Sequence, residues 1–171
     1  EDGAFLAGGQ TLLPTLKQRL AQPSDLIDLS GIGSLSNIEV GEVVKVGAMT
    51  THAEVATSKE IQKALPALSD LAEGIGDPQV RNRGTIGGSV ANNDPAADYP
   101  AICLALNATI TTNKREITAD DFFTGMFDTA LDEGELITSI SFPIPEKAAY
   151  MKFPNPASRY ALVGVFVAKM S

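Results

Sequence analysis

The sequence contains few of the residues that build redox and metal centres. Among its 171 residues there are one cysteine, one histidine and no tryptophan. A disulfide needs two thiols, and a four-thiolate iron–sulfur cluster needs four, so neither can form within the chain. A structural zinc site also needs more cysteine and histidine ligands than the chain has. Any metal redox centre that serves this protein must therefore lie on another chain.

The two single residues do not indicate catalysis. Cys103 lies in the apolar run of residues 101–106, so we expect a buried thiol without chemistry. His52 directly follows Thr51, which has capping-box spacing to Glu54, so we expect an exposed residue in the first turn of a helix. We therefore expect no catalytic residue, no hydrolytic triad and no metal site on this chain.

Basic residues are also scarce. The 13 lysines and arginines are outnumbered by 21 acidic residues, and the formal net charge is −8. Such a balance repels phosphate backbones and anionic lipid, so a nucleic-acid partner is not expected. No apolar run approaches the ~20 residues of a membrane-spanning helix, and no secretion signal is visible. We expect a cytoplasmic protein without a membrane span.

The two ends suggest a piece of a larger subunit. The sequence begins with Glu1 instead of a methionine, and it stops at Ser171, just past the strand-like run of residues 161–168. We therefore expect a fragment, although 171 residues with 44% hydrophobic content suffice for one domain with its own core.

Strand-like and helical patterns are mixed along the chain, which predicts an α+β fold. Helices are expected from Thr51 to Ala64, from Pro66 to about Ile75, and after Asp94, with Pro95 in the first turn. A further helix is expected after the strand of residues 4–7 and the glycine turn at residues 8–9, because leucines at 12, 16 and 20 are one helical turn apart. The strands are expected near residues 4–7, 25–29, 37–40, 43–46, 108–112, 136–142, 151–153 and 161–168.

Two glycine pairs carry the functional hypothesis. Gly8 and Gly9 lie between a strand and a helix, where backbone N–H groups without an intervening Cβ can point together at an anion. Alone, such a pair is more typical of a plain strand-to-helix turn. Gly87 and Gly88 repeat the arrangement, and polar residues follow them. Together they predict a ligand with phosphate and with hydroxyl or ring-edge groups. The polar residues are Ser89, Asn92, Asn93, Asp94 and Asp98.

Other nucleotide-binding motifs are incomplete. Gly31 and Gly33 follow a strand-like run, but Ser36 occupies the position of the third glycine of a Rossmann fingerprint. A strand-like segment, residues 37–40, then follows where that motif requires a helix. The sequence also lacks the glycine-rich lysine motif of a P-loop.

The glycine pairs and their surroundings resemble the flavin motifs of one family, the FAD-binding subunits of the molybdopterin dehydrogenases. This family includes the medium subunit of aerobic carbon monoxide dehydrogenase and the flavin domain of xanthine dehydrogenase. The similar segments follow the family's order and cover nearly the whole chain. They are residues 7–14, 81–89, 94–98, 122–125 and 134–137, together with Lys152.

The resemblance implies an α+β fold of the vanillyl-alcohol-oxidase/CO-dehydrogenase flavoprotein type, in which FAD lies between two small α/β subdomains. Residues 1–171 would form one FAD-binding domain, without the family's N-terminal strand–helix unit and C-terminal domain. Ile75 is a further, variable lining position. The implied cofactor-binding residues are Ala7, Gly8, Gly9, Gln10, Thr11 and Leu12 at the pyrophosphate, Thr85, Ile86, Gly87, Gly88 and Ser89 at the phosphate and flavin, and Asp98, Ile137 and Lys152 near the ribityl chain and ring.

The resemblance also implies a function. In the family, a large subunit oxidises the substrate at a molybdenum cofactor, and electrons pass through 2Fe-2S clusters on a small subunit to FAD and an external acceptor. This chain would be the flavoprotein subunit of such an oxidoreductase, and the flavin would carry the chemistry that its side chains lack.

Two alternatives remain open. One is a stand-alone flavin oxidase or reductase of the same superfamily, which would need a catalytic acid or a flavin-linking histidine or cysteine, and His52 and Cys103 are poor candidates. The other is a non-catalytic nucleotide-binding or assembly module. The substrate and the final electron acceptor are not defined by the sequence.

Overall fold

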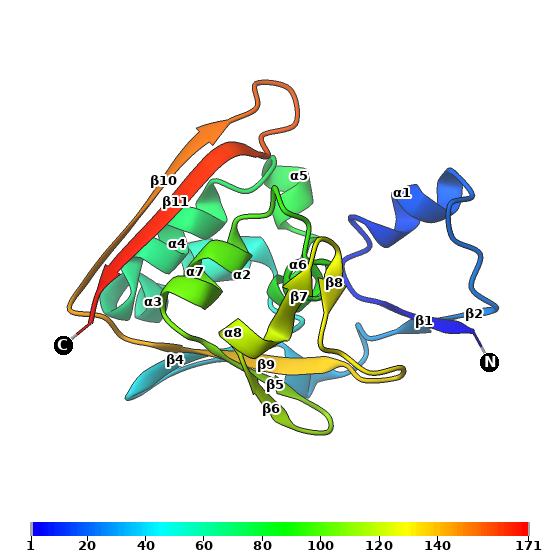
Figure 1. The fold of residues 1–171 in the computed structure, drawn as a ribbon, viewed down its shortest axis with the longest axis horizontal. Helices are drawn as coiled ribbons and strands as arrows, with labels where there is room; N and C mark the ends of the chain where they lie inside the picture. The colour runs from blue at the N-terminus through cyan, green and yellow to red at the C-terminus, as the bar shows by residue number, and fades with distance from the viewer. Residues whose placement is uncertain (1, 171) are drawn as a thin grey trace.

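A computed structural model describes residues 2–170, and its N-terminal part forms a small unit of its own. Strand β1 (Gly3–Leu6) pairs in parallel with β2 (Asp25–Asp28), and helix α1 (Leu12–Lys17) connects them. Figure 1 shows this unit projecting from one side of the molecule. The turn from β1 into α1 contains the first glycine pair, so this pair belongs to the small unit and not to the larger one.

The larger unit is built on a five-stranded antiparallel sheet with the strand order β3-β4-β9-β5-β6. Its central strand is β9, whose Ile140 and Phe142 are fully buried. Strand β9 is hydrogen-bonded to β4 on one side and to β5 on the other, and these two strands fix its position. The strands are β3 (Ile38–Val40), β4 (Val43–Gly47), β5 (Thr109–Thr112), β6 (Glu116–Thr118) and β9 (Ile137–Pro143).

Helices cover one face of this sheet (Figure 1). Helix α6 packs on β4 and β9, whereas α4 and α7 also contact the hairpin β10–β11 on their far side. The principal helices are α2 (His52–Thr57), α3 (Lys59–Ala64), α4 (Pro66–Glu73), α6 (Ile86–Asn92) and α7 (Tyr99–Ala105). The shorter elements are η1 (Gly33–Leu35), α5 (Pro78–Arg81), α8 (Ala119–Phe122), β7 (Phe123–Gly125) and β8 (Asp128–Thr129).

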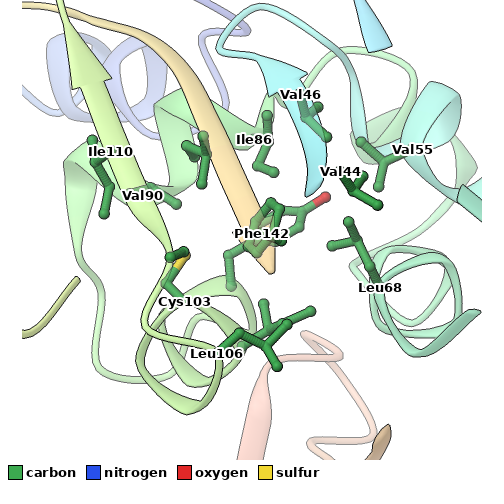
Figure 2. Packing of buried hydrophobic residues seen from close by; sticks show 14 of the residues in the cluster. Val44, Val46, Val55, Leu68, Ile86, Val90, Cys103, Leu106, Ile110 and Phe142 are labelled. Atoms are coloured by element: carbon green, nitrogen blue, oxygen red, sulfur yellow. The ribbon is translucent and has the colours of Figure 1, made fainter. Parts of the chain in front are cut away.

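The core lies between the sheet and the helices (Figure 2). Val44 and Val46 of β4, Phe142 of β9 and Leu68 of α4 belong to one hydrophobic cluster, and all four are fully buried. Cys103 is buried in the same cluster, as expected from its apolar surroundings. The core therefore holds the helices that carry half of the candidate site in fixed positions.

The last two strands form an antiparallel hairpin, β10 (Lys147–Pro154) and β11 (Ala161–Lys169), on the outside of the helix layer. Tyr150 pairs with Phe166 and Lys152 with Gly164 in its register. Since side chains alternate across a strand, Tyr150 and Lys152 share the inner face. Strand β10 is longer than the expected strand of residues 151–153.

The structure confirms the α+β class but corrects two helices. The expected helix from Thr51 to Ala64 is two helices, because Ser58 has an extended backbone and its hydroxyl accepts the Ile61 amide at 3.3 Å, which caps α3. The capping box of Thr51 and Glu54 is confirmed. No helix within residues 2–170 has the length and apolarity needed to cross a membrane.

The helix expected after Asp94 begins four residues later. Helix α7 starts at Tyr99, with Asp98 at the N-cap position and Pro100 in the first turn. The Asp94 carboxylate instead accepts the Ala96 amide at 2.8 Å, which closes a local turn. This shift brings Asp98, instead of Asp94, to the buried start of the helix.

Candidate functional site

A cavity of about 650 Å³ lies where the small unit meets the large one. This volume falls within the ~300–1,000 Å³ of typical cofactor sites. Its walls come from the β1–α1 turn, the first turns of α6, the approach to α7, the start of β9 and the tip of the hairpin β10–β11. Segments far apart in sequence therefore converge on one cavity.

The structure brings together twelve of the fourteen residues predicted from the resemblance. The two others lie outside the lining: Ile86 is fully buried in the core, and Lys152 lies behind Asp98. Ile75 also lines the cavity. The twelve lining residues are Ala7, Gly8, Gly9, Gln10, Thr11, Leu12, Thr85, Gly87, Gly88, Ser89, Asp98 and Ile137.

The β1–α1 turn presents a row of free backbone donors. Within residues 2–170, the amides from Gly8 to Leu12 donate to no protein acceptor. Gly9 has φ +71°, a conformation that favours glycine. A Cβ on Gly8 would lie 2.0 Å from the carbonyl oxygen of Arg83. Gly8 therefore allows the turn to rest against residues 83–84, and the row of amides remains at the cavity wall.

The second glycine pair works differently, and our expectation of free amides there is wrong. The Gly87 amide donates to the Ala48 carbonyl at 2.9 Å, and the Gly88 amide donates to the Thr85 hydroxyl at 3.1 Å. A Cβ on Gly87 would lie 2.5 Å from the Cβ of Ala48. Gly87 therefore permits close packing of α6 on the end of β4, and Gly88 keeps the wall opposite Ala7 free of side chain.

Asp98 is a buried polar residue of the cavity, with 4% of its surface exposed. Its Oδ1 accepts the Tyr150 hydroxyl at 2.5 Å, and the Lys152 ammonium lies 3.0 Å from both carboxylate oxygens. Lys152 also donates to the Gly74 carbonyl at 3.1 Å. The lysine therefore reaches the cavity only through Asp98.

The remaining polar residues after Gly88 divide into two groups. Ser89, Asn92 and Asp94 line the cavity. Asn93 does not, because its backbone is left-handed (φ +43°) and its side-chain amide donates to the carbonyls of Gly125 and Asp128 at 2.7 and 2.9 Å. Asn93 thus holds the β7–β8 turn to the end of α6.

His52 is buried, which corrects our expectation of an exposed residue. It lines the cavity, and its Nδ1 lies 3.3 Å from the Tyr99 hydroxyl. Burial, with a smaller contribution from the charge of Arg81, lowers the pKa of His52 to about 4. The imidazole is therefore neutral at physiological pH. A Cβ on Gly84 would lie 2.6 Å from Nε2, so His52 packs directly against the segment that supports the β1–α1 turn.

Glu135 anchors the loop that leads into β9. Its carboxylate accepts from Arg115 Nε and Nη2 at 3.1 and 3.0 Å, from the Thr112 hydroxyl at 2.6 Å and from the Asp132 amide at 2.9 Å. These hydrogen bonds lower the pKa of Glu135 to about 2, and the hydrogen bond from Arg115 contributes most. Two cavity carboxylates, Glu135 and Asp98, thus each have a cationic partner, which reduces their repulsion of an anionic ligand.

Sequence reasoning missed several residues at the site. Tyr150 lies two positions before Lys152 on a strand, so its place on the same face as the lysine was a usable signal. Tyr160 and Arg159 at the hairpin tip also line the cavity, but nothing local places them there.

The arrangement is one for binding more than for acid–base chemistry. The free amides suit an anion, and Asp98 offers a carboxylate acceptor on another wall of the same cavity. The thiol of Cys103 and the phenol of Tyr99 are buried, and burial raises the pKa of both, so neither is a nucleophile at neutral pH. A dinucleotide with one anionic bridge and several hydroxyl or N–H donors fits these residues.

Comparison with known proteins identifies the family. Residues 1–145 match the family described as "FAD binding domain in molybdopterin dehydrogenase". The chain is 41% identical to the nicotine 6-hydroxylase medium subunit of Paenarthrobacter nicotinovorans, and 40% identical to the carbon monoxide dehydrogenase medium chain of Hydrogenophaga pseudoflava. These alignments cover 98% and 97% of this chain, respectively, and 61% of each relative, so the chain spans under two thirds of their length.

Solved structures give the same result. The structure matches reconstituted carbon monoxide dehydrogenase from Oligotropha carboxidovorans with a TM-score of 0.94 and 39% identity, over 100% of this chain and 63% of that one. It also matches quinoline 2-oxidoreductase from Pseudomonas putida 86, with a TM-score of 0.91 and 36% identity, over 95% and 59% of the two chains. These matches confirm the expected fold and FAD as the expected cofactor. The chain belongs to the FAD-binding domain family of the molybdopterin dehydrogenases.

Proposed function

We propose that the cavity holds FAD and that the amides from Gly8 to Leu12 hold its pyrophosphate. The observation that carries this proposal is a row of backbone donors that have no acceptor in the described part of the chain, on the wall of a cofactor-sized cavity. Backbone amides that point together bind phosphate without basic side chains. This suits a protein with a net charge of −8.

Other residues would complete the site. Thr85, Gly88 and Ser89 form the wall opposite the amide row, where the missing Cβ of Gly88 leaves room for the cofactor. Asp98 would accept a hydrogen bond from a ribityl hydroxyl or a ring N–H. Ile137 would supply an apolar contact to the ring, and Lys152 would act on the cofactor only through Asp98.

We further propose that the whole protein is the flavoprotein subunit of a molybdenum hydroxylase-type dehydrogenase. It would stand between the 2Fe-2S clusters of a small partner subunit and an external electron acceptor, while a large subunit carries the molybdenum cofactor. FAD suits this position because a flavin exchanges electrons singly or in pairs. The relatives' names mention nicotine, carbon monoxide and glyceraldehyde, which fits a substrate chosen outside this type of domain. A cytoplasmic location stays a prediction.

The test is purification of the full-length protein without added flavin, followed by a visible spectrum and quantification of flavin released by denaturation. We expect one FAD per chain, and co-purification of a molybdenum subunit and a 2Fe-2S subunit. Bound FAD without these partners would favour a stand-alone flavoenzyme. A folded protein that neither retains nor takes up FAD would refute the proposal.

A further inference from the structure

Tyr150 lies outside the cavity lining, yet its hydroxyl is hydrogen-bonded to Asp98, a buried carboxylate that lines the cavity. Its ring packs near Phe166 of the adjacent strand, with ring centroids 6.4 Å apart, and its hydroxyl reaches inward to Asp98. The two residues are 52 positions apart in the sequence, so the contact joins the hairpin β10–β11 to the start of α7. We propose that Tyr150 is a positioning residue for the cofactor and that it acts by orienting Asp98. This inference rests on the proposed binding of FAD.

The geometry leaves Asp98 little freedom. Lys152 lies equally close to both of its oxygens, at 3.0 Å, so the ion pair alone does not select one rotation of the carboxylate. The Tyr150 hydroxyl adds a directional bond of 2.5 Å to Oδ1 only. A carboxylate has about four acceptor positions. With Oδ1 held by Tyr150, a defined acceptor position of Asp98 remains for a donor in the cavity.

A third residue makes this contact possible. A Cβ on Gly164 of β11 would lie 2.5 Å from the Tyr150 hydroxyl oxygen and 3.3 Å from the ring carbon that carries it. Gly164 pairs directly with Lys152 in the hairpin. The absence of a side chain at this position therefore leaves the space in which the hydroxyl meets Asp98.

Two substitutions disturb the hydrogen bond between Tyr150 and Asp98 in different ways. Tyr150→Phe removes the hydroxyl and keeps the ring, whereas Gly164→Ala keeps the hydroxyl and displaces it. Val163→Ala is the matched control, because Val163 is an exposed neighbour on β11 that pairs with Phe153 on the outer face. All three variants are made in the full-length protein, and FAD is titrated into the flavin-free form of each.

We expect Tyr150→Phe and Gly164→Ala each to raise the Kd for FAD about tenfold, the order of one weakened hydrogen bond to a charged group. The double variant should bind FAD as tightly as Tyr150→Phe alone, because both substitutions remove the same hydrogen bond between Tyr150 and Asp98. The visible absorption bands of the bound flavin should also shift in both single variants, which loss of hairpin stability alone would not cause. Val163→Ala should match the wild type in Kd and spectrum.

The outcomes separate this inference from the proposed function. A wild type that binds no FAD would overturn both. A wild type that binds FAD, with unchanged Kd and spectrum in Tyr150→Phe or in Gly164→Ala, would overturn the role of Tyr150 alone. Additive losses in the double variant would also overturn it, because they would mean that the two residues act separately. If one variant does not fold, the other still decides.

Discussion

Replacement of Gly8 by alanine should weaken FAD binding, because it would push the β1–α1 turn away from residues 83–84. The new Cβ would lie 2.0 Å from the Arg83 carbonyl oxygen and 2.8 Å from the Cα of Gly84. Both are backbone atoms, so no side-chain rotation can relieve the overlap. The β1–α1 turn would have to retreat by roughly 1 Å or more to restore ordinary contact distances.

Such a retreat displaces the amide row from the position at which it faces the cavity. Loss of a single hydrogen bond to a charged group costs about 2 kcal/mol, which corresponds to a roughly 30-fold rise in Kd. We therefore expect at least this loss for Gly8→Ala, measured by titration of FAD into the flavin-free protein. Thermal unfolding of the same samples establishes that the variant is folded.

Gly33→Ala is the matched control. A Cβ at Gly33 would have no heavy atom of the described residues within 4 Å, and the φ of Gly33 is not in the left-handed region. The same change of residue should leave the Kd for FAD unchanged, which also tests the dismissal of the Gly31–Gly33 segment as a Rossmann loop. A folded Gly8→Ala protein with wild-type affinity would refute the reasoning about the amide row.

Three further predictions concern other walls of the cavity. Gly88→Val should abolish flavin retention, because its Cβ would begin 2.9 Å from the Thr85 hydroxyl and its methyl groups would extend into the gap between the two loops; a folded variant that releases a full equivalent of flavin on denaturation would contradict this. Asp98→Ala should weaken FAD by about 1–3 kcal/mol and lower the free energy of unfolding by about 3 kcal/mol, because Lys152 loses its buried partner; unchanged affinity in a titration would place Asp98 outside the site. The pKa of His52 is lowered to about 4 from 6.5, so between these values the unfolded chain binds a proton that the folded chain does not, and stability declines as pH falls. The wild type should lose about 2 kcal/mol more than His52→Gln between pH 7 and pH 5 in urea unfolding, and equal losses would contradict the buried neutral imidazole.

Local sequence signals predicted much of the fold because the interactions behind them are local. The capping box at Thr51 and Glu54 involves residues three apart, and the structure confirms it. The break at Ser58 is also local, but the apolar pattern continues across it and hides it. The helix expected after Asp94 instead follows Asp98, as α7. Burial of Asp98 against Lys152, which lies 54 residues away, distinguishes it from Asp94.

The site was only partly predictable for the same reason. The first glycine pair was predicted to bind an anion only in combination with the second pair and the family resemblance, and it does line the cavity. The second pair has the same local sequence character, but its amides are taken by Ala48 and Thr85, and the contact to Ala48 exists only after β4 and α6 pack together. The burial of His52 is likewise a tertiary effect, because its helix position alone is compatible with exposure.

Amide hydrogen exchange with and without FAD tests the central claim most directly. Without FAD, the amides from Gly8 to Leu12 have no acceptor among residues 2–170 and should exchange rapidly, whereas those of Gly87 and Gly88 are already hydrogen-bonded and should be slow. Saturation with FAD should slow exchange strongly at residues 8–12 and change it little at residues 87–88. Unchanged rapid exchange at residues 8–12 in the FAD-saturated protein would contradict the account.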